Sequence, residues 1–150
     1  MTAPEEGIPA RVQHDGGVLP VHLNTVRLFV HVLAATVWVG GQLTLAGLVP
    51  GLRAIAPDAP RIVARRFNRI AWPAYAVLIV TGLWNIGAVH PTWSGRYGAT
   101  LIVKIVVVAL SGLSAWLHTV STTKKGLAVW GALTGTSALA ALFLGVMLHG

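Results

Sequence analysis

The chain has 150 residues, of which 55% are hydrophobic and only 10% charged, and its mean hydropathy is +0.72. An ordinary soluble domain has about 25% charged residues, so this composition indicates an integral membrane protein. Cysteine is absent, which excludes disulfides, thiolate metal sites and cysteine-linked haem. The net charge of +7 comes mostly from segments beside apolar stretches, where membrane topology accounts for it, so we expect no nucleic-acid partner.

Acidic residues are rare, and three of the four precede residue 16: Glu5, Glu6, Asp15 and Asp58. This distribution argues against carboxylate acid–base catalysis, carboxylate cation sites and carboxylate proton relays inside the membrane.

Residues 1–22 are polar and contain several Gly and Pro residues, and we expect a mobile tail rather than a signal peptide. Four apolar stretches follow at about 24–49, 70–89, 99–120 and 127–148. Each is near the roughly 20 residues that cross a bilayer, and lipid-exposed backbone must be helical. The first should end at Pro50-Gly51. Short connections then predict one all-α membrane domain over residues 23–150, an antiparallel up-down four-helix bundle.

Basic residues predict the orientation of this bundle. Seven of the eleven lie in the first and third connections: Arg53, Arg61, Arg65, Arg66, Arg69, Lys124 and Lys125. Cytoplasmic loops are enriched in Lys and Arg, so in a bacterial cell membrane both termini would face outward. We expect Trp72, Trp116 and Trp130 in an aromatic belt at the inner boundary and Trp93 at the outer one.

Two ionisable side chains fall at membrane depth, where such residues are costly and indicate function. His31 and Lys104 lie roughly 10 and 8 Å below the outer boundary at 1.5 Å per residue. Asn85 and Thr81 reach this level from the second span. The alternative is structural: His31 would bond a carbonyl of a neighbouring helix, and Lys104 would extend outward to the surface.

The polar residues of the first span share one helical face, which should therefore point into the bundle. This face holds Asn24, Arg27, His31, Ala35, Trp38 and Gln42. Small residues between His31 and Trp38 predict a flat recess beside the imidazole, suited to a large planar ligand.

Each of the remaining histidines is either a candidate for a second ligand or a residue without a ligand role. His22, His90 and His149 lie near the outer surface, whereas His118 falls about 21 Å deeper than Lys104, near the inner boundary. In the fourth span, Gly131 and Gly135 form a GxxxG pair that favours close helix packing, inside the bundle or in a homo-oligomer.

The run RLFVHVLAATVWVGGQL around His31, the TGLWN segment at 81–85 and the run GATLIVKIVVV around Lys104 resemble a known family. It comprises CopD-like copper-resistance membrane proteins and the HemJ-type membrane protoporphyrinogen oxidase. The resemblance covers about residues 25–120. It implies a noncovalent b-type haem in the bundle, with the family's functional His and Lys at His31 and Lys104. The Tyr-His pair of the oxidase group is missing from the second half of the third span.

These observations favour a membrane haem protein with a redox role, and an oxidoreductase if it is an enzyme. His31 would bind the iron, and Lys104 would be the opposite ligand or a catalytic cation. Trp38 and Asn85 would line the pocket, and Arg27 and Arg96 would pair with propionates. The substrate would be a small gas or a porphyrin-like molecule.

Two alternatives stay open. Copper handling is one, although copper(I) favours sulfur ligands and the chain has only Met1 and Met147. The other is a structural membrane subunit without a cofactor.

Overall fold

A computed structural model describes residues 22–91 and 93–148. Within these ranges the chain is helical and has no strand: α1 (Leu23–Ala35), η1 (Thr36–Gly40), α2 (Gly41–Ile55), α3 (Ala59–Val89), α4 (Gly95–Val120) and α5 (Lys124–Met147). Because α1, η1 and α2 are continuous, they form one helical segment. With α3, α4 and α5, the described residues hold four segments that are long and apolar enough to cross a membrane. The all-helical, four-span prediction is confirmed. The predicted mobile tail lies outside the described residues, except for His22.

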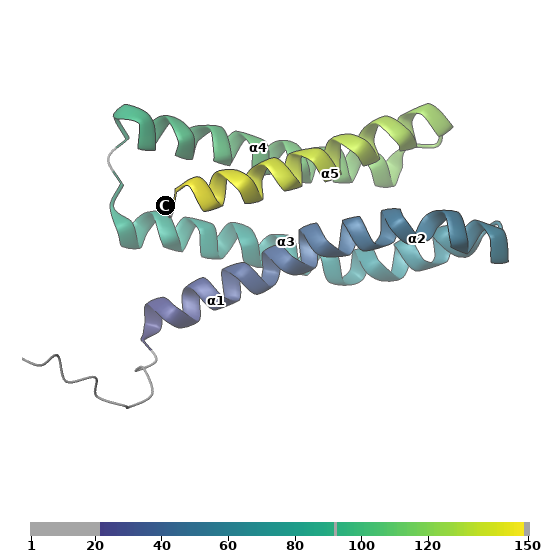
Figure 1. Ribbon diagram of the computed structural model, residues 1–150, viewed down its shortest axis with the longest axis horizontal. Coiled ribbons are helices and arrows are strands. Elements are labelled where there is room, and N and C mark those ends of the chain that lie inside the picture. Colours follow the sequence, from purple (N-terminus) through teal and green to yellow (C-terminus); the bar gives the residue numbers. More distant parts are fainter. Residues whose placement is uncertain (1–21, 92, 149–150) are drawn as a thin grey trace, which may run out of the picture.

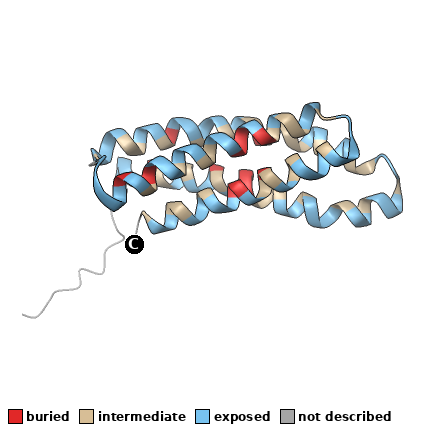
Figure 2. Cartoon of the chain, turned by 90° about the horizontal axis from the view of Figure 1, so that it is seen from above, coloured by how far each residue is buried: buried red, intermediate tan, exposed pale blue. Residues whose placement is uncertain are grey.

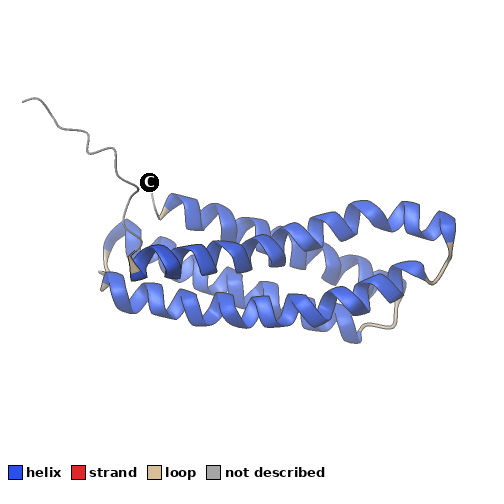
Figure 3. Cartoon of the chain, turned by 90° about the horizontal axis from the view of Figure 1, so that it is seen from below, coloured by secondary structure: helices blue, strands red, loops and turns tan. Residues whose placement is uncertain are grey.

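The four segments run antiparallel, with connections at alternate ends (Figures 1 and 3). The closest packing is within two hairpins, one formed by α1, η1, α2 and α3 and the other by α4 and α5. Between the hairpins, η1 approaches α5 most closely. The end that holds the start of α1 and the α3–α4 connection is called the outer end below, and the end that holds the α2–α3 and α4–α5 connections is called the inner end.

The helices extend further at the inner end than hydropathy alone predicted. The first segment continues through Pro50 to Ile55, and α3 begins at Ala59 rather than near Ile70. At 1.5 Å per residue, the 31 residues of α3 span about 46 Å, against roughly 30 Å for the hydrocarbon core. The extra turns of α3 carry exposed arginines, which lowered the local hydropathy without interrupting the helix.

The buried centre of the bundle is narrow and largely made of small side chains (Figure 2). Ser111 and Ser114 are 1% and 0% exposed, and Thr134 and Ser137 are also buried. Large hydrophobic side chains such as Phe29, Val106 and Phe143 are instead exposed on the outside of the bundle. Membrane helices associate through small residues that allow close approach, while large apolar residues face lipid.

Three of the buried hydroxyls in this centre bond a backbone carbonyl of their own helix, whereas Ser111 Oγ donates to Thr134 O of α5 at 3.5 Å. Ser114 Oγ donates to Leu110 O at 2.7 Å, and Ser137 Oγ donates to Leu133 O at 2.6 Å. Thr134 Oγ1 lies 2.7 Å from Trp130 O and 3.1 Å from Ser114 Oγ, so it also links α5 to α4. These hydroxyls therefore lie inside the bundle without leaving unsatisfied polar atoms.

Candidate functional site

His31 is half-buried on α1 and faces α3. Its Nδ1 lies 2.7 Å from Thr81 Oγ1, and its Cε1 would be 3.7 Å from a Cβ placed on Gly82. Thr81 Oγ1 is also 2.6 Å from Val77 O, a carbonyl that can only accept. The single hydroxyl hydrogen of Thr81 therefore goes to Val77, and Thr81 accepts a hydrogen bond from Nδ1–H of His31.

This hydrogen bond fixes the tautomer of the neutral imidazole. With the proton on Nδ1, the lone pair of His31 is on Nε2, the nitrogen that can accept a hydrogen bond or bind a metal. Histidines that bind metals usually donate their other ring N–H to an oxygen in this way. The partner of Nδ1 on the neighbouring helix is a threonine hydroxyl.

Arg27 and Asn85 occupy the next turn of the same interface toward the outer end. Arg27 precedes His31 by one turn on α1, and Asn85 follows Thr81 by one turn on the antiparallel α3, so they lie at a similar level. Arg27 is only 6% exposed. Its Nε and the Oδ1 of Asn85 are buried without a hydrogen-bond partner within the described part of the chain.

Lys104 lies on the other hairpin. Its Nζ would be 3.1 Å from a Cβ placed on Gly145, so the amine rests against α5. His31, by contrast, rests against Thr81 and Gly82 of α3. Arg96 is exposed in the first turn of α4. The two side chains predicted at the same depth therefore contact different helices, α3 and α5.

Trp38 belongs to an aromatic cluster in the middle of the bundle, here called the Trp38 cluster: Trp38, Trp72 and Tyr75. The Trp38 ring lies 4.5 Å from Tyr75 and 5.8 Å from Trp72, centroid to centroid. Its Nε1–H donates to Ser111 Oγ at 3.1 Å, and the Tyr75 hydroxyl donates to Val108 O at 2.9 Å. The cluster thus connects the two hairpins.

This packing changes two predictions. Ala34 is buried and the Trp38 ring is covered by Trp72 and Tyr75, so this stretch of the α1 face is filled rather than a flat recess. Trp72, expected in the interfacial belt, is half-buried and packs against Trp38 and Tyr75. The sequence analysis missed Tyr75 altogether, although its spacing of three from Trp72 puts both on one face of a helix.

The other histidines lie away from this site. His118 Nδ1 bonds Leu127 O at 2.9 Å, and its ring rests against Gly131 near the inner end. His22 and His90 are exposed at the outer ends of α1 and α3, and His149 is outside the described residues. Over residues 22–91 and 93–148, no three side chains of His, Asp or Glu lie together where they could hold a metal ion.

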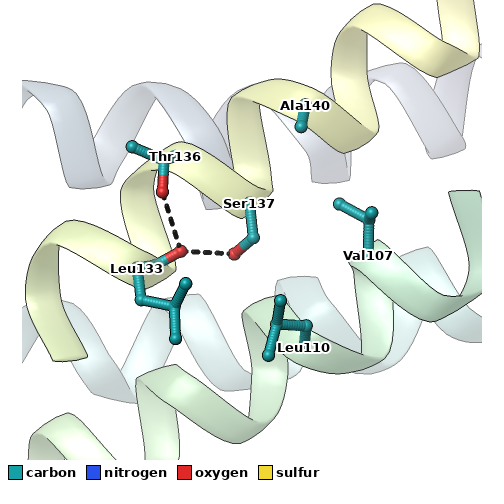
Figure 4. A pocket seen from close by; sticks show the side chains of 6 residues that line it. All are labelled: Val107, Leu110, Leu133, Thr136, Ser137 and Ala140. Atoms are coloured by element: carbon teal, nitrogen blue, oxygen red, sulfur yellow. Dashed lines mark hydrogen bonds between the residues drawn. The ribbon is translucent and has the colours of Figure 1, made fainter.

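A shallow apolar cavity of about 280 Å³ lies between α4 and α5, and none of the predicted site residues lines it (Figure 4). Its lining consists of Val107, Leu110, Leu133, Thr136, Ser137 and Ala140. The two hydroxyls in this lining both bond Leu133 O, so they are occupied by the backbone of α5.

Comparison with known protein families gives one match. The family model described as copper resistance protein D (CopD) matches residues 61–148, which is more than half of the chain and covers most of α3 together with α4 and α5. Arg27, His31 and Trp38 lie before the matched range. No curated protein and no solved structure matches the chain.

Proposed function

Because the chain belongs to the family of copper resistance protein D, we propose that it handles copper ions as cargo in the membrane. His31 is the proposed ligand at membrane depth. The observation that supports this role is the hydrogen bond between His31 Nδ1 and Thr81, which directs the lone pair of the neutral imidazole to Nε2. Imidazole nitrogen binds copper, and a hydrogen-bonded second nitrogen holds the ring in a fixed orientation.

Copper loading of the purified protein tests this proposal. The wild type and His31→Ala would be incubated with copper(I) in nanodiscs, washed, and analysed for copper by mass spectrometry. We expect copper retention in the wild type and its loss in His31→Ala. His118→Ala is the matched control, because His118 is also half-buried but bonds Leu127 O near the inner end. Equal copper content in the wild type and His31→Ala would exclude His31 as the ligand.

Noncovalent b-type haem is the second candidate, and the unpartnered Nε of Arg27 favours it. A buried guanidinium one turn from His31 repels a copper ion but suits a propionate. His31 would then hold the iron, Arg27 a propionate, and Asn85, Lys104 and Arg96 would be further contacts. Haem would supply one-electron redox chemistry, and an enzyme of this kind would be an oxidoreductase, as in the HemJ-type group. The filled face beside Trp38 weighs against it.

Optical spectroscopy separates the two candidates on the same preparation. A Soret band that is present in the wild type and absent in His31→Ala supports haem, whereas copper retention without such a band supports copper handling. For either candidate we propose that the basic ends of α2 and α3 face the cytoplasm of a bacterial cell, with the outer end on the opposite side.

A further inference from the structure

We propose that Arg27 and Asn85 form a binding site for the oxyanion headgroup of a membrane amphiphile, at the outer end of the α1–α3 interface. This site goes beyond copper handling and does not depend on it. The proposal starts from two buried polar atoms without partners, Arg27 Nε and Asn85 Oδ1, which the register of the two helices places at a similar level.

Arg27 carries a charge that the described protein does not balance. A guanidinium group carries a positive charge in proteins, and Arg27 is only 6% exposed. Asp58 is the one acidic side chain in the described residues, and it lies at the inner end, between α2 and α3. A buried charge without a counter-ion is strongly unfavourable, so Arg27 favours an anion from outside the described residues.

Asn85 supplies a second polar group with adaptable hydrogen bonding. Its side-chain amide carries two donors and one acceptor, and rotation by 180° exchanges the oxygen and nitrogen positions. The buried amide position that has no partner can therefore present N–H to an anion. Arg27 and Asn85 together offer charge-assisted and neutral donors to one oxyanion.

Depth and surroundings indicate that the anion belongs to an amphiphile. Arg27 lies four residues into α1, about 6 Å from its first residue along the helix axis. This is the level of the outer membrane interface, where lipid phosphates and carboxylates lie. Val26 and Phe29 next to Arg27 are 46% and 63% exposed, and Val89 beyond Asn85 is 58% exposed. An acyl chain would find apolar surface on both helices while its headgroup reaches Arg27.

Phosphate and carboxylate headgroups share this chemistry, and three probes distinguish them: dioleoyl-phosphatidic acid, oleate and dioleoylglycerol. Each would be added to delipidated full-length protein in neutral detergent, with native mass spectrometry and thermal unfolding as the measurements. We expect one molecule of phosphatidic acid or of oleate to bind and to raise the unfolding temperature. The anion that binds and raises the unfolding temperature identifies the headgroup as phosphate or carboxylate. Dioleoylglycerol should neither bind nor raise the unfolding temperature.

Arg27→Gln should weaken the binding of that anion about tenfold to hundredfold, the range expected for losing a charge-assisted hydrogen bond. Arg65→Gln is the matched control, because Arg65 is an exposed arginine at the inner end of α3 and should leave the affinity unchanged. Asn85→Leu provides a second variant in case Arg27→Gln does not fold, and it should also weaken binding. Equal anion affinity in the wild type and the tested variant, or equal stabilisation by dioleoylglycerol, would overturn the proposal.

Discussion

The α4–α5 interface and the outer half of the α1–α3 interface both bury polar side chains, but the hydrogen bonding of these side chains differs between the two. Between α4 and α5 the polar groups are the short hydroxyls of Ser114, Thr134 and Ser137, and each reaches a carbonyl of its own helix. Between α1 and α3 the polar groups include Arg27 and Asn85, whose buried Nε and Oδ1 lack partners in the described structure.

The length of the side chain explains this contrast. A serine or threonine hydroxyl in a helix can bond the carbonyl four residues earlier, so it enters a membrane bundle without needing anything from outside. A guanidinium or an amide extends beyond its own backbone and has more hydrogen-bonding groups than one carbonyl can satisfy. We therefore interpret the α4–α5 interface as a packing interface and the outer α1–α3 interface as a binding site.

The largest expected effect is on packing, at Gly112 of α4. A Cβ at this position would overlap the ring and hydroxyl of Tyr75, which cannot easily move because Trp38 and Trp72 surround it. Gly112→Ala should therefore lower the free energy of unfolding by about 1–3 kcal/mol, the usual cost of overpacking. Unfolding in a mixed-micelle denaturant titration measures this effect.

Gly135→Ala is the control for this substitution, since a Cβ on Gly135 of α5 meets nothing within 4 Å. If both variants are equally stable, the Trp38 cluster does not hold the two hairpins together.

A change at Thr81 should weaken binding and largely preserve the fold. Thr81→Val removes the acceptor for Nδ1–H of His31, so the imidazole loses its fixed orientation and tautomer. Loss of such a supporting group typically reduces metal affinity about tenfold to hundredfold, and we expect this for copper. A copper(I) competition titration measures it.

Thr44→Val is the comparison for Thr81→Val, because the Thr44 hydroxyl is exposed and bonds only Gly40 O of its own helix. Identical copper affinities of the two variants would contradict the orienting role of Thr81.

The smallest effect on stability is expected at Lys104, which rests against α5. Lys104→Met should change the free energy of unfolding by less than about 1 kcal/mol, because the ammonium forms no ion pair within the described residues. Copper loading at His31 should be unchanged. If the protein binds haem, Lys104→Met should change the absorption spectrum of the haem more than it changes the free energy of unfolding. A large loss of stability without any spectral change would make Lys104 a structural residue.

Hydropathy predicted the four spans because apolar length is a property of each segment taken alone. It gave a shorter α3 than the structure shows, since the turns that carry Arg61, Arg65 and Arg66 lower the local hydropathy without interrupting the helix. Local composition reflects the lower hydropathy of these turns but not the continuity of the helix.

The site was predicted in part for a related reason. The helical face that holds Arg27 and His31 could be derived from the spacing along one helix, and both residues do face the bundle. The partners Thr81 and Gly82 depend on how α1 and α3 are rotated against each other, which a single sequence does not state. The same limit applied to Lys104, whose depth was estimated without its direction. Trp72 and Tyr75 were missed because a tryptophan near a boundary is equally typical of a lipid interface.

The π-helical turn η1 affects how many residues the chain needs between α1 and α2 to keep the side chains of α1 facing α3. A π-helical turn holds more residues than an α-helical turn, and each added residue rotates a helix by about 100°. Deleting one residue from Thr36–Gly40 would leave a continuous helix of nearly the same hydropathy. The π turn takes up one extra residue, so this deletion would restore an α-helical turn and leave Arg27 and His31 facing α3. The same deletion within α1, between His31 and η1, would turn these side chains about 100° away from their partners on α3.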